Sequence, residues 1–130
     1  MQTNEEKYNT ITKENINVMV MKFYTRILNE NTDVSKVFKS RLGEDINSSM
    51  WQEHTELLTN FWAMIALQDT HYQGNPMMAH LNMGLTKDMF PIWLKIFFET
   101  IDSLYDEEQG YIFKSRAENI AMNFIRNLRL

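Results

Sequence analysis

The sequence contains no cysteine, so it can form no disulfide, no thiolate metal site and no thiol nucleophile. It has only four glycines and two prolines among 130 residues, which predicts few tight turns and long uninterrupted elements. No run of about 18 apolar residues is present, and we therefore expect no transmembrane helix. The first residues lack the basic segment and apolar run of a signal peptide, so we expect a cytoplasmic protein.

Basic residues are also in the minority, with 13 Lys and Arg against 17 Asp and Glu. The resulting net charge of −4 argues against nucleic-acid binding, which needs a basic face. By contrast, ten Met, eight Phe and three Trp predict a soft interior of large side chains. Such an interior suits either an ordinary helical core or a cavity around a flat apolar ligand, and composition alone favours the ordinary core.

Apolar residues recur three and four positions apart, which is the spacing of helices that bury one face. We expect residues 1–11 to be a frayed polar segment and residues 12–130 to form one domain. No segment alternates with period two over a useful length, so the fold class is all-α. The first expected helix is capped by Thr12, and a short piece from Asp33 to Phe38 follows it. The next helix is opened by a capping box of Ser49 and Gln52, and a short one runs from Pro76 to about Asn82. The last two are capped by Asp88, with Pro91 in the first turn, and by Asp106.

Three histidines are candidates for chemistry. His54 lies on an apolar helical stripe. It suits either a core histidine that is hydrogen-bonded to a backbone carbonyl, or a functional residue that acts as a ligand or donates a hydrogen bond to a ligand. His80 lies among Met77, Met78 and Leu81, either as a surface histidine at a helix end or as an axial metal ligand. His71 is in a polar stretch, and we expect it to be exposed and dispensable.

Two polar-tipped aromatic residues, Tyr24 and Trp93, are each adjacent to an apolar stripe. They suit packing at the edge of the core, or a pocket into which the Tyr O–H and the Trp N–H point.

Four segments, taken in order and at this spacing, resemble the group III truncated haemoglobins, a family of bacterial globins. The resemblance runs from about Ile16 to Leu128. The segments are Lys22-Phe23-Tyr24, Met50-Trp51-Gln52-Glu53-His54 continuing to Asn60-Phe61-Trp62-Ala63, Tyr72 through Pro76 to His80-Leu81, and Phe90-Pro91-Ile92-Trp93 to Phe97.

This resemblance implies a truncated globin fold, a two-over-two helical sandwich around haem b. It makes His80 the proximal iron ligand, and it places Tyr24, His54 and Trp93 in the distal pocket. Tyr72, Arg41 and His71 are candidates for the haem propionates, because Met77 and Met78 stand where some relatives carry lysines. The implied haem contacts are Phe38, Phe23, Met50, Trp51, Leu58, Phe61, Trp62, Tyr72, Phe90 and Phe97.

The function that the resemblance implies is binding of O₂ or another diatomic gas, with retention tight enough for redox chemistry rather than storage. An NO dioxygenase or a peroxidase-like activity is expected, served by an unidentified reductase. Two alternatives from other classes stay open: a histidine phosphotransfer module, and a cytochrome-like electron carrier with Met and His axial ligands. A phosphotransfer module needs an exposed histidine, whereas His54 lies on the apolar stripe.

Overall fold

The computed structural model describes residues 6–74 and 83–130. The predicted short helix from Pro76 to about Asn82, with His80, lies outside these residues. The described part contains α1 (Lys13–Leu28), α2 (Asp33–Leu42), α3 (Ser49–Leu67), α5 (Met89–Leu104) and α6 (Glu107–Asn127), and within it the only β-type pairing is an isolated bridge. The prediction of an all-α fold is confirmed.

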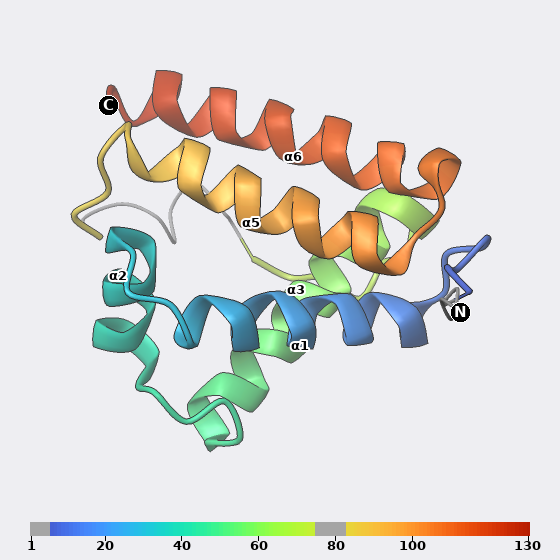
Figure 1. Ribbon diagram of the computed structural model, residues 1–130, viewed down its shortest axis with the longest axis horizontal. Coiled ribbons are helices and arrows are strands. Elements are labelled where there is room, and N and C mark those ends of the chain that lie inside the picture. The colour runs from blue at the N-terminus through green and yellow to red at the C-terminus, as the bar shows by residue number, and fades with distance from the viewer. Residues whose placement is uncertain (1–5, 75–82) are drawn as a thin grey trace, which may run out of the picture.

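The long helices form two pairs, one stacked on the other (Figure 1). Helix α3 crosses α1, and α6 runs antiparallel to α5. The two pairs meet mainly where α1 lies along α5. The shorter helix α2 stands at the end of α1 and contacts both α1 and α5.

Side chains cap the helix starts that the sequence predicts at Thr12 and Asp106. Thr12 Oγ1 accepts from the Asn15 N–H, and Asn15 Oδ1 accepts from the Thr12 N–H, which forms a reciprocal capping box. Asp106 accepts from the Gln109 N–H at 2.8 Å. Both caps are therefore confirmed as predicted.

The starts of α3 and α5 differ from the prediction in detail. Ser48, rather than Ser49, caps α3 by accepting from the Trp51 N–H at 3.3 Å. The Gln52 side chain donates instead to the Asn47 carbonyl at 3.2 Å, so the predicted Ser49–Gln52 box is wrong by one residue. Helix α5 does begin after Asp88, but Asp88 has helical φ and ψ and its side chain makes no capping hydrogen bond in the described structure.

Helix α2 is one turn longer than the predicted piece from Asp33 to Phe38. Thr32 caps it by accepting from the Ser35 N–H at 3.0 Å. It ends at Gly43, whose φ of 84° is in the left-handed region that favours glycine. The extra turn brings Arg41 and Leu42 into the helix.

The amino-terminal segment is less loose than expected. The Tyr8 N–H donates to the Leu104 carbonyl at 2.8 Å, and the Asp106 N–H donates to the Tyr8 carbonyl at 3.0 Å. These two bonds fasten Tyr8 to the junction of α5 and α6, so the expected fraying does not extend to this residue.

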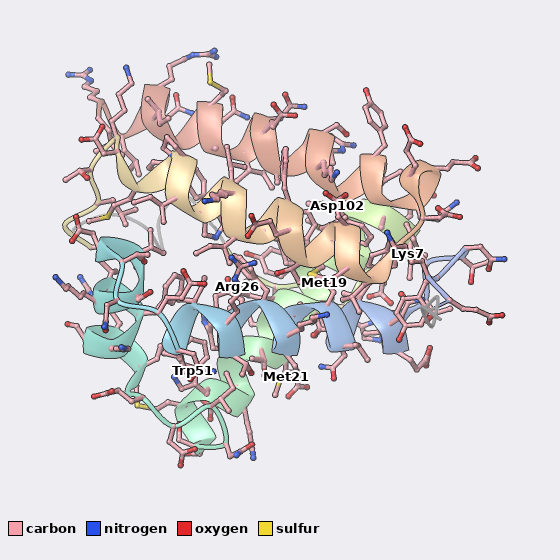
Figure 2. All side chains as sticks on the ribbon, viewed as in Figure 1. Lys7, Met19, Met21, Arg26, Trp51 and Asp102 are labelled. Atoms are coloured by element: carbon pink, nitrogen blue, oxygen red, sulfur yellow. The ribbon has the colours of Figure 1, made fainter. Side chains whose placement is uncertain are left out.

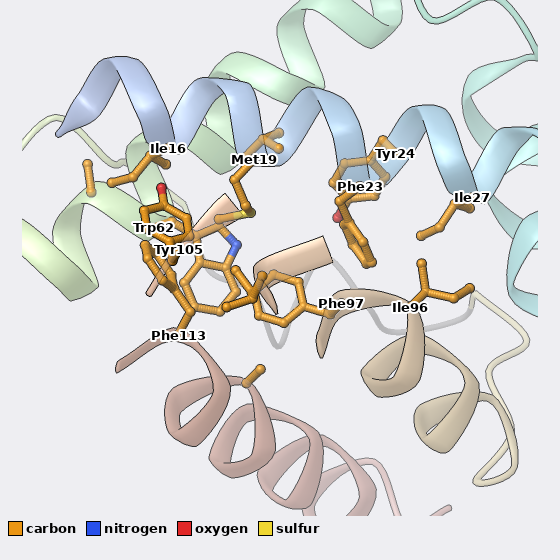
Figure 3. Packing of buried hydrophobic residues seen from close by; sticks show 14 of the residues in the cluster. Ile16, Met19, Phe23, Tyr24, Ile27, Trp62, Ile96, Phe97, Tyr105 and Phe113 are labelled. Atoms are coloured by element: carbon orange, nitrogen blue, oxygen red, sulfur yellow. The ribbon is translucent and has the colours of Figure 1, made fainter. Parts of the chain in front are cut away.

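The core lies between the two helix pairs (Figure 3). Ile16, Met19, Phe23 and Ile27 of α1 are buried against side chains from α3, α5 and α6. Those partners include Trp62, Ile96, Phe97, Ile101 and Phe113.

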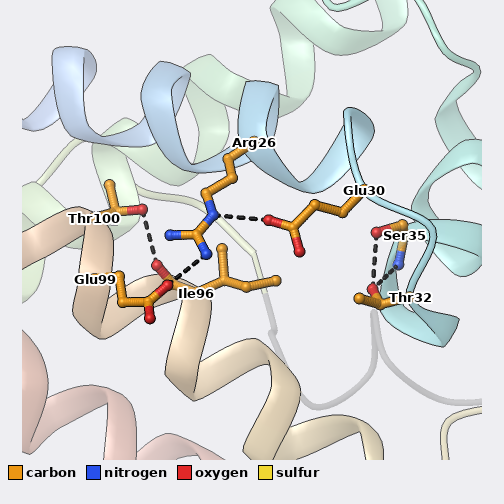
Figure 4. Close-up of polar contacts among 7 residues, drawn as sticks. All are labelled: Arg26, Glu30, Thr32, Ser35, Ile96, Glu99 and Thr100. Carbon is orange, nitrogen blue, oxygen red and sulfur yellow. Dashed lines mark hydrogen bonds and ion pairs between the residues drawn. The ribbon is translucent and has the colours of Figure 1, made fainter.

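Polar side chains gather at the periphery of the fold (Figure 2). Arg26 of α1 pairs with Glu30 at 2.7 Å and with Glu99 of α5, which links the two helices across their exposed edge (Figure 4). Exposed ion pairs of this kind add at most about 1 kcal/mol to stability. None of the helices in the described part is long and apolar enough to cross a membrane.

Candidate functional site

A cavity of about 350 Å³ lies between α2, α3, α5 and α6, with one end of α1 at its edge. Its described lining is mainly aliphatic and aromatic. The lining residues are Tyr24, Val34, Val37, Phe38, Arg41, Leu42, His54, Leu57, Leu58, Phe61, Trp62, Tyr72, Met83, Leu85, Met89, Phe90, Trp93, Ile120, Ala121 and Phe124. Such a cavity, apolar with a few polar groups, is typical of small-molecule and cofactor sites.

Most of the residues predicted for the site line this cavity. The three predicted distal residues, Tyr24, His54 and Trp93, come from α1, α3 and α5 and meet there. The predicted contacts that also line it are Phe38, Leu58, Phe61, Trp62, Tyr72 and Phe90.

Four other predicted contacts are not among the lining residues. Phe23, Trp51 and Phe97 are buried behind the lining, where they pack against Tyr24 or Trp93. Met50 is 53% exposed on α3, because the helix turns this position toward solvent. His80 lies outside the described residues, and its role stays a prediction.

Tyr24 is held within a cluster of rings. Its ring lies 5.7 Å from that of His54, 5.2 Å from Phe38 and 5.5 Å from Trp51, measured between centroids. Burial raises the pKa of the Tyr24 hydroxyl well above its ordinary value. The phenol therefore keeps its proton at neutral pH and is a hydrogen-bond donor at the cavity edge.

The ring of His54 packs against the indole of Trp51. The two rings lie edge to face with centroids 5.6 Å apart, and the Trp51 Nε1–H donates to the Gly43 carbonyl at 2.8 Å. The Nε2 atom of His54 is shielded from solvent. This placement within the cavity does not suit a phosphotransfer histidine, which must be exposed.

Trp93 is oriented by aromatic stacking. Its ring lies nearly parallel to that of Phe97, with centroids 5.5 Å apart and planes 5° apart, and meets Phe23 edge to face at 6.0 Å. Phe97 is fully buried, so it supplies a rigid support for the indole that borders the cavity.

Of the three candidates for the propionate groups, Arg41 and Tyr72 line the cavity and His71 does not. Arg41 is the single formally charged residue in the described lining. The side chain of His71 is 69% exposed, and its Nδ1 lies 2.7 Å from Asp69 Oδ1. The expectation that His71 is exposed is confirmed.

Sequence reasoning missed several lining residues. Those on α2 and α6 could have been found from their helical spacing, since Val34 and Val37, like Ile120 and Phe124, recur three or four positions apart. Met83 and Leu85 carry no such periodic signal because they lie in the stretch before α5. The missed residues are Val34, Val37, Leu42, Leu57, Met83, Leu85, Met89, Ile120, Ala121 and Phe124.

The arrangement fits a flat apolar cofactor with a small ligand beside it. The broad apolar walls suit a porphyrin, while Tyr24, His54 and Trp93 add polar groups to the lining. Within the described residues no three His, Cys, Asp or Glu side chains are grouped to hold a metal ion by themselves. Haem needs only one protein ligand to its iron in many globins, so this finding agrees with a haem site.

A helical sandwich with such a cavity defines a protein of the globin class, and the comparisons with known proteins specify the family. No family model matches the chain. The group 3 truncated hemoglobin ctb of Campylobacter jejuni is 32% identical over 119 residues, which are 91% of each chain. The crystal structure of group III truncated hemoglobin from Campylobacter jejuni matches with a TM-score of 0.83 and 31% identity, covering 95% of each chain.

The chain therefore belongs to the group III truncated haemoglobins, and the predicted truncated globin fold is confirmed. Membership of this family implies a haem cofactor and a diatomic gas as its ligand.

Proposed function

We propose that this chain binds haem b through His80 and retains O₂ tightly enough to favour redox chemistry over storage. The single observation that carries the proposal is the convergence of Tyr24, His54 and Trp93, from three helices, on one cavity. Haem, when bound, supplies an iron that takes up a diatomic gas and exchanges electrons.

The three side chains act as hydrogen-bond donors toward that gas. O₂ held in the pocket presents partial negative charge to its surroundings, whereas CO presents much less. One hydrogen bond adds about 1 kcal/mol net, and somewhat more in a dry pocket. Since each 1.4 kcal/mol changes a dissociation constant about tenfold, two or three donors slow O₂ release by roughly 10- to 1000-fold.

Slow release supports a redox role. A protein that releases O₂ slowly is a poor carrier. Donors that polarise the held ligand would favour reaction of O₂ with NO, or reduction of a peroxide held in place of O₂. Such turnover requires electrons from outside the chain, and we propose a reductase as their source. The reaction class is therefore NO dioxygenation or peroxide reduction.

The visible spectrum tests the cofactor and its protein ligand. We expect the purified protein to show a strong Soret band and to bind CO in the ferrous form. His80→Ala should lose most of the haem or show a changed spectrum, because the iron loses its only protein ligand. His54→Ala is the matched control and should keep the haem, since a distal residue shapes the ligand space. Haem loss from His54→Ala with retention in His80→Ala would reverse the two assignments.

A six-coordinate ferrous spectrum that resists CO would favour the cytochrome-like alternative instead. Formation of nitrate from NO by the oxygenated protein tests the redox role, and O₂ release as fast as that of a storage globin would contradict it.

A further inference from the structure

A row of aromatic rings connects the cavity to the protein surface at Tyr8. Trp62, which lines the cavity, lies 5.8 Å from Phe113 between ring centroids. Phe113 lies 4.9 Å from Tyr105, and Tyr105 lies 5.5 Å from Tyr8. We name Trp62, Phe113, Tyr105 and Tyr8 the aromatic row, and Figure 3 shows its three buried members together.

The other cavity tryptophan, Trp93, is connected to the aromatic row through Phe97. Trp93 stacks on Phe97, and Phe97 stacks on Trp62 with centroids 5.0 Å apart and planes 18° apart. If either tryptophan loses an electron to the cavity, the electron can therefore be replaced through the same series of closely packed rings. Trp and Tyr give up an electron more easily than other side chains, and the Phe113 ring is a short bridge between Trp62 and Tyr105.

Exposure changes sharply along the row. Trp62 is 5% exposed, and Phe113 and Tyr105 are fully or almost fully buried, whereas Tyr8 is 36% exposed. Two backbone hydrogen bonds hold Tyr8 against the α5–α6 junction, which fixes its ring beside that of Tyr105. The row therefore has a buried interior and one end in contact with water.

The two tyrosines differ in where their protons can go. The Tyr105 hydroxyl donates to Asn15 Oδ1 at 2.7 Å, and burial raises the pKa of Tyr105 with a further contribution from Tyr8. The buried Tyr105 cannot release its proton to solvent, so an electron vacancy on its ring is short-lived and is filled from Tyr8. Tyr8 meets solvent, so it can release a proton to water once it loses an electron.

We propose that the aromatic row carries electrons from Tyr8 to the cavity when hydrogen peroxide reacts there, and that Tyr8 is the site where the chain is oxidised. This inference rests on the proposed haem cofactor. Its consequence is that oxidising equivalents leave the distal pocket for the surface, which spares Tyr24, His54 and Trp93 from damage.

The reaction balances with peroxide as the oxidant. One H₂O₂ breaks its O–O bond, takes two electrons and two protons, and becomes two water molecules. One of these electrons comes from Tyr8 of the same molecule through the aromatic row, with its phenol proton passing to solvent, and the second comes from the bound haem, with the second proton taken from solvent. The oxidised Tyr8 rings of two such molecules then join by a carbon–carbon bond, so two H₂O₂, two tyrosines, two haem electrons and two solvent protons give four waters and one dityrosine.

Tyr111 provides a matched control for exposure. It is 69% exposed on α6, which makes it more accessible than Tyr8, and no ring contact joins it to the aromatic row in the described structure. Oxidation by radicals that diffuse in solution would favour Tyr111, whereas transfer along the row favours Tyr8.

The experiment treats the ferric, haem-loaded protein with hydrogen peroxide and a nitroso spin trap, and then locates the adduct by peptide mass spectrometry. Dityrosine fluorescence and covalent dimer on a denaturing gel are measured without the trap. We expect the adduct at Tyr8 in the wild type. Tyr8→Phe should abolish that adduct and most of the dimer, whereas Tyr111→Phe should change neither.

Tyr105→Phe tests the row itself, since it keeps the ring contacts and removes only the redox-active phenol. We expect it to lose most of the Tyr8 adduct while it consumes peroxide at the wild-type rate, with its fold checked by circular dichroism.

An adduct mainly on Tyr111, Tyr72 or Tyr24, or a Tyr8 adduct that Tyr105→Phe leaves unchanged, would overturn the proposal. The Soret band shows whether haem is bound, and it therefore distinguishes failure of this inference from failure of the proposed function. A protein that binds haem and consumes peroxide without oxidation of Tyr8 overturns this inference alone, whereas a protein that takes up no haem overturns the proposed function as well.

Discussion

Helix α3 has one face toward α1 and another toward the cavity, and the two faces differ in how deeply their side chains are buried. The face toward α1 carries Thr55 and Thr59, and each of these polar residues is only 5% exposed. The face toward the cavity carries Leu57 and Leu58, and Leu57 remains 39% exposed. Two polar threonines on the α1 face are thus more deeply buried than the apolar Leu57 on the cavity face.

The threonines are buried at low cost because their hydroxyls are satisfied. Thr59 Oγ1 donates to the Thr55 carbonyl at 2.7 Å and accepts from Asn17 Nδ2 of α1 at 3.2 Å. The leucines are less buried because they border a cavity. The comparison teaches that one face of α3 stabilises the fold, whereas the other contributes a binding surface that a large apolar cofactor can cover.

The comparison predicts that removing Trp51 destabilises the protein whether or not haem is bound. Trp51 is fully buried between α1, α2 and α3, and its indole N–H bonds the Gly43 carbonyl. Trp51→Ala should cost about 3–5 kcal/mol of unfolding free energy. Urea unfolding of the apo and haem-loaded forms measures this cost. Met50→Ala is the control, because its exposed side chain should contribute less than about 0.5 kcal/mol.

Leu58→Ala should show the reverse pattern on the cavity face. The apo protein should lose less stability than with Trp51→Ala, since Leu58 borders a cavity and has fewer contacts to lose. Haem binding should weaken by roughly 1.5–3 kcal/mol, which is tenfold or more in haem release. Transfer of haem to an acceptor apoglobin measures the rate. A large apo destabilisation with unchanged haem release would contradict the division between the two faces.

The hydrogen-bond donors should affect O₂ far more than CO. Tyr24→Phe and Trp93→Phe each remove one donor worth about 1 kcal/mol, so O₂ release should accelerate several-fold to about tenfold. Stopped-flow O₂ dissociation and CO binding test this difference. Tyr105→Phe is the matched control, because Tyr105 is equally buried but outside the cavity lining, and it should leave O₂ release unchanged.

Stability should decline at alkaline pH because of the buried tyrosines. Burial raises the pKa of Tyr24 and Tyr105 above the ordinary 10.0 in the folded protein. Below pH 10 the tyrosines are protonated in both the folded and the unfolded protein, so their ionisation does not reduce the free energy of unfolding. Above it the unfolded chain ionises first, and stability falls as pH rises. Urea unfolding at about pH 8 and about pH 11 should show a smaller loss for Tyr24→Phe than for the wild type.

The smallest effect is expected at His71. Its side chain lies in the exposed turn beside Asp69 and does not line the cavity. His71→Ala should therefore leave haem content and O₂ release unchanged, as the spectrum and stopped-flow kinetics can establish. Tenfold altered ligand kinetics would show that this loop reaches the haem.

Much of the fold could be predicted from the sequence because the signals are local. The caps at Thr12 and Asp106 depend on residues within three positions of the helix start, and the stripes depend on the helical repeat. Ser48 and Ser49 show the limit of this reasoning. Both are good capping residues, and only the backbone conformation selects Ser48.

The site could be predicted only in part. Tyr24, His54 and Trp93 could be predicted as cavity residues because their segments resemble a known family in residue type and spacing. Residue type could not separate Phe23 and Phe97, which support the lining, from Phe38 and Phe61, which form it.

The sequence by itself determined the helices, their apolar stripes and the family, since these depend on neighbouring residues and on motifs read in order. Only the tertiary structure decided which side of each stripe meets another helix and which meets the cavity. It also placed Tyr8 beside Tyr105, although the two are 97 positions apart in the sequence. The physical reason is that burial and ring contact depend on how whole helices pack, and this packing joins residues that no local pattern relates.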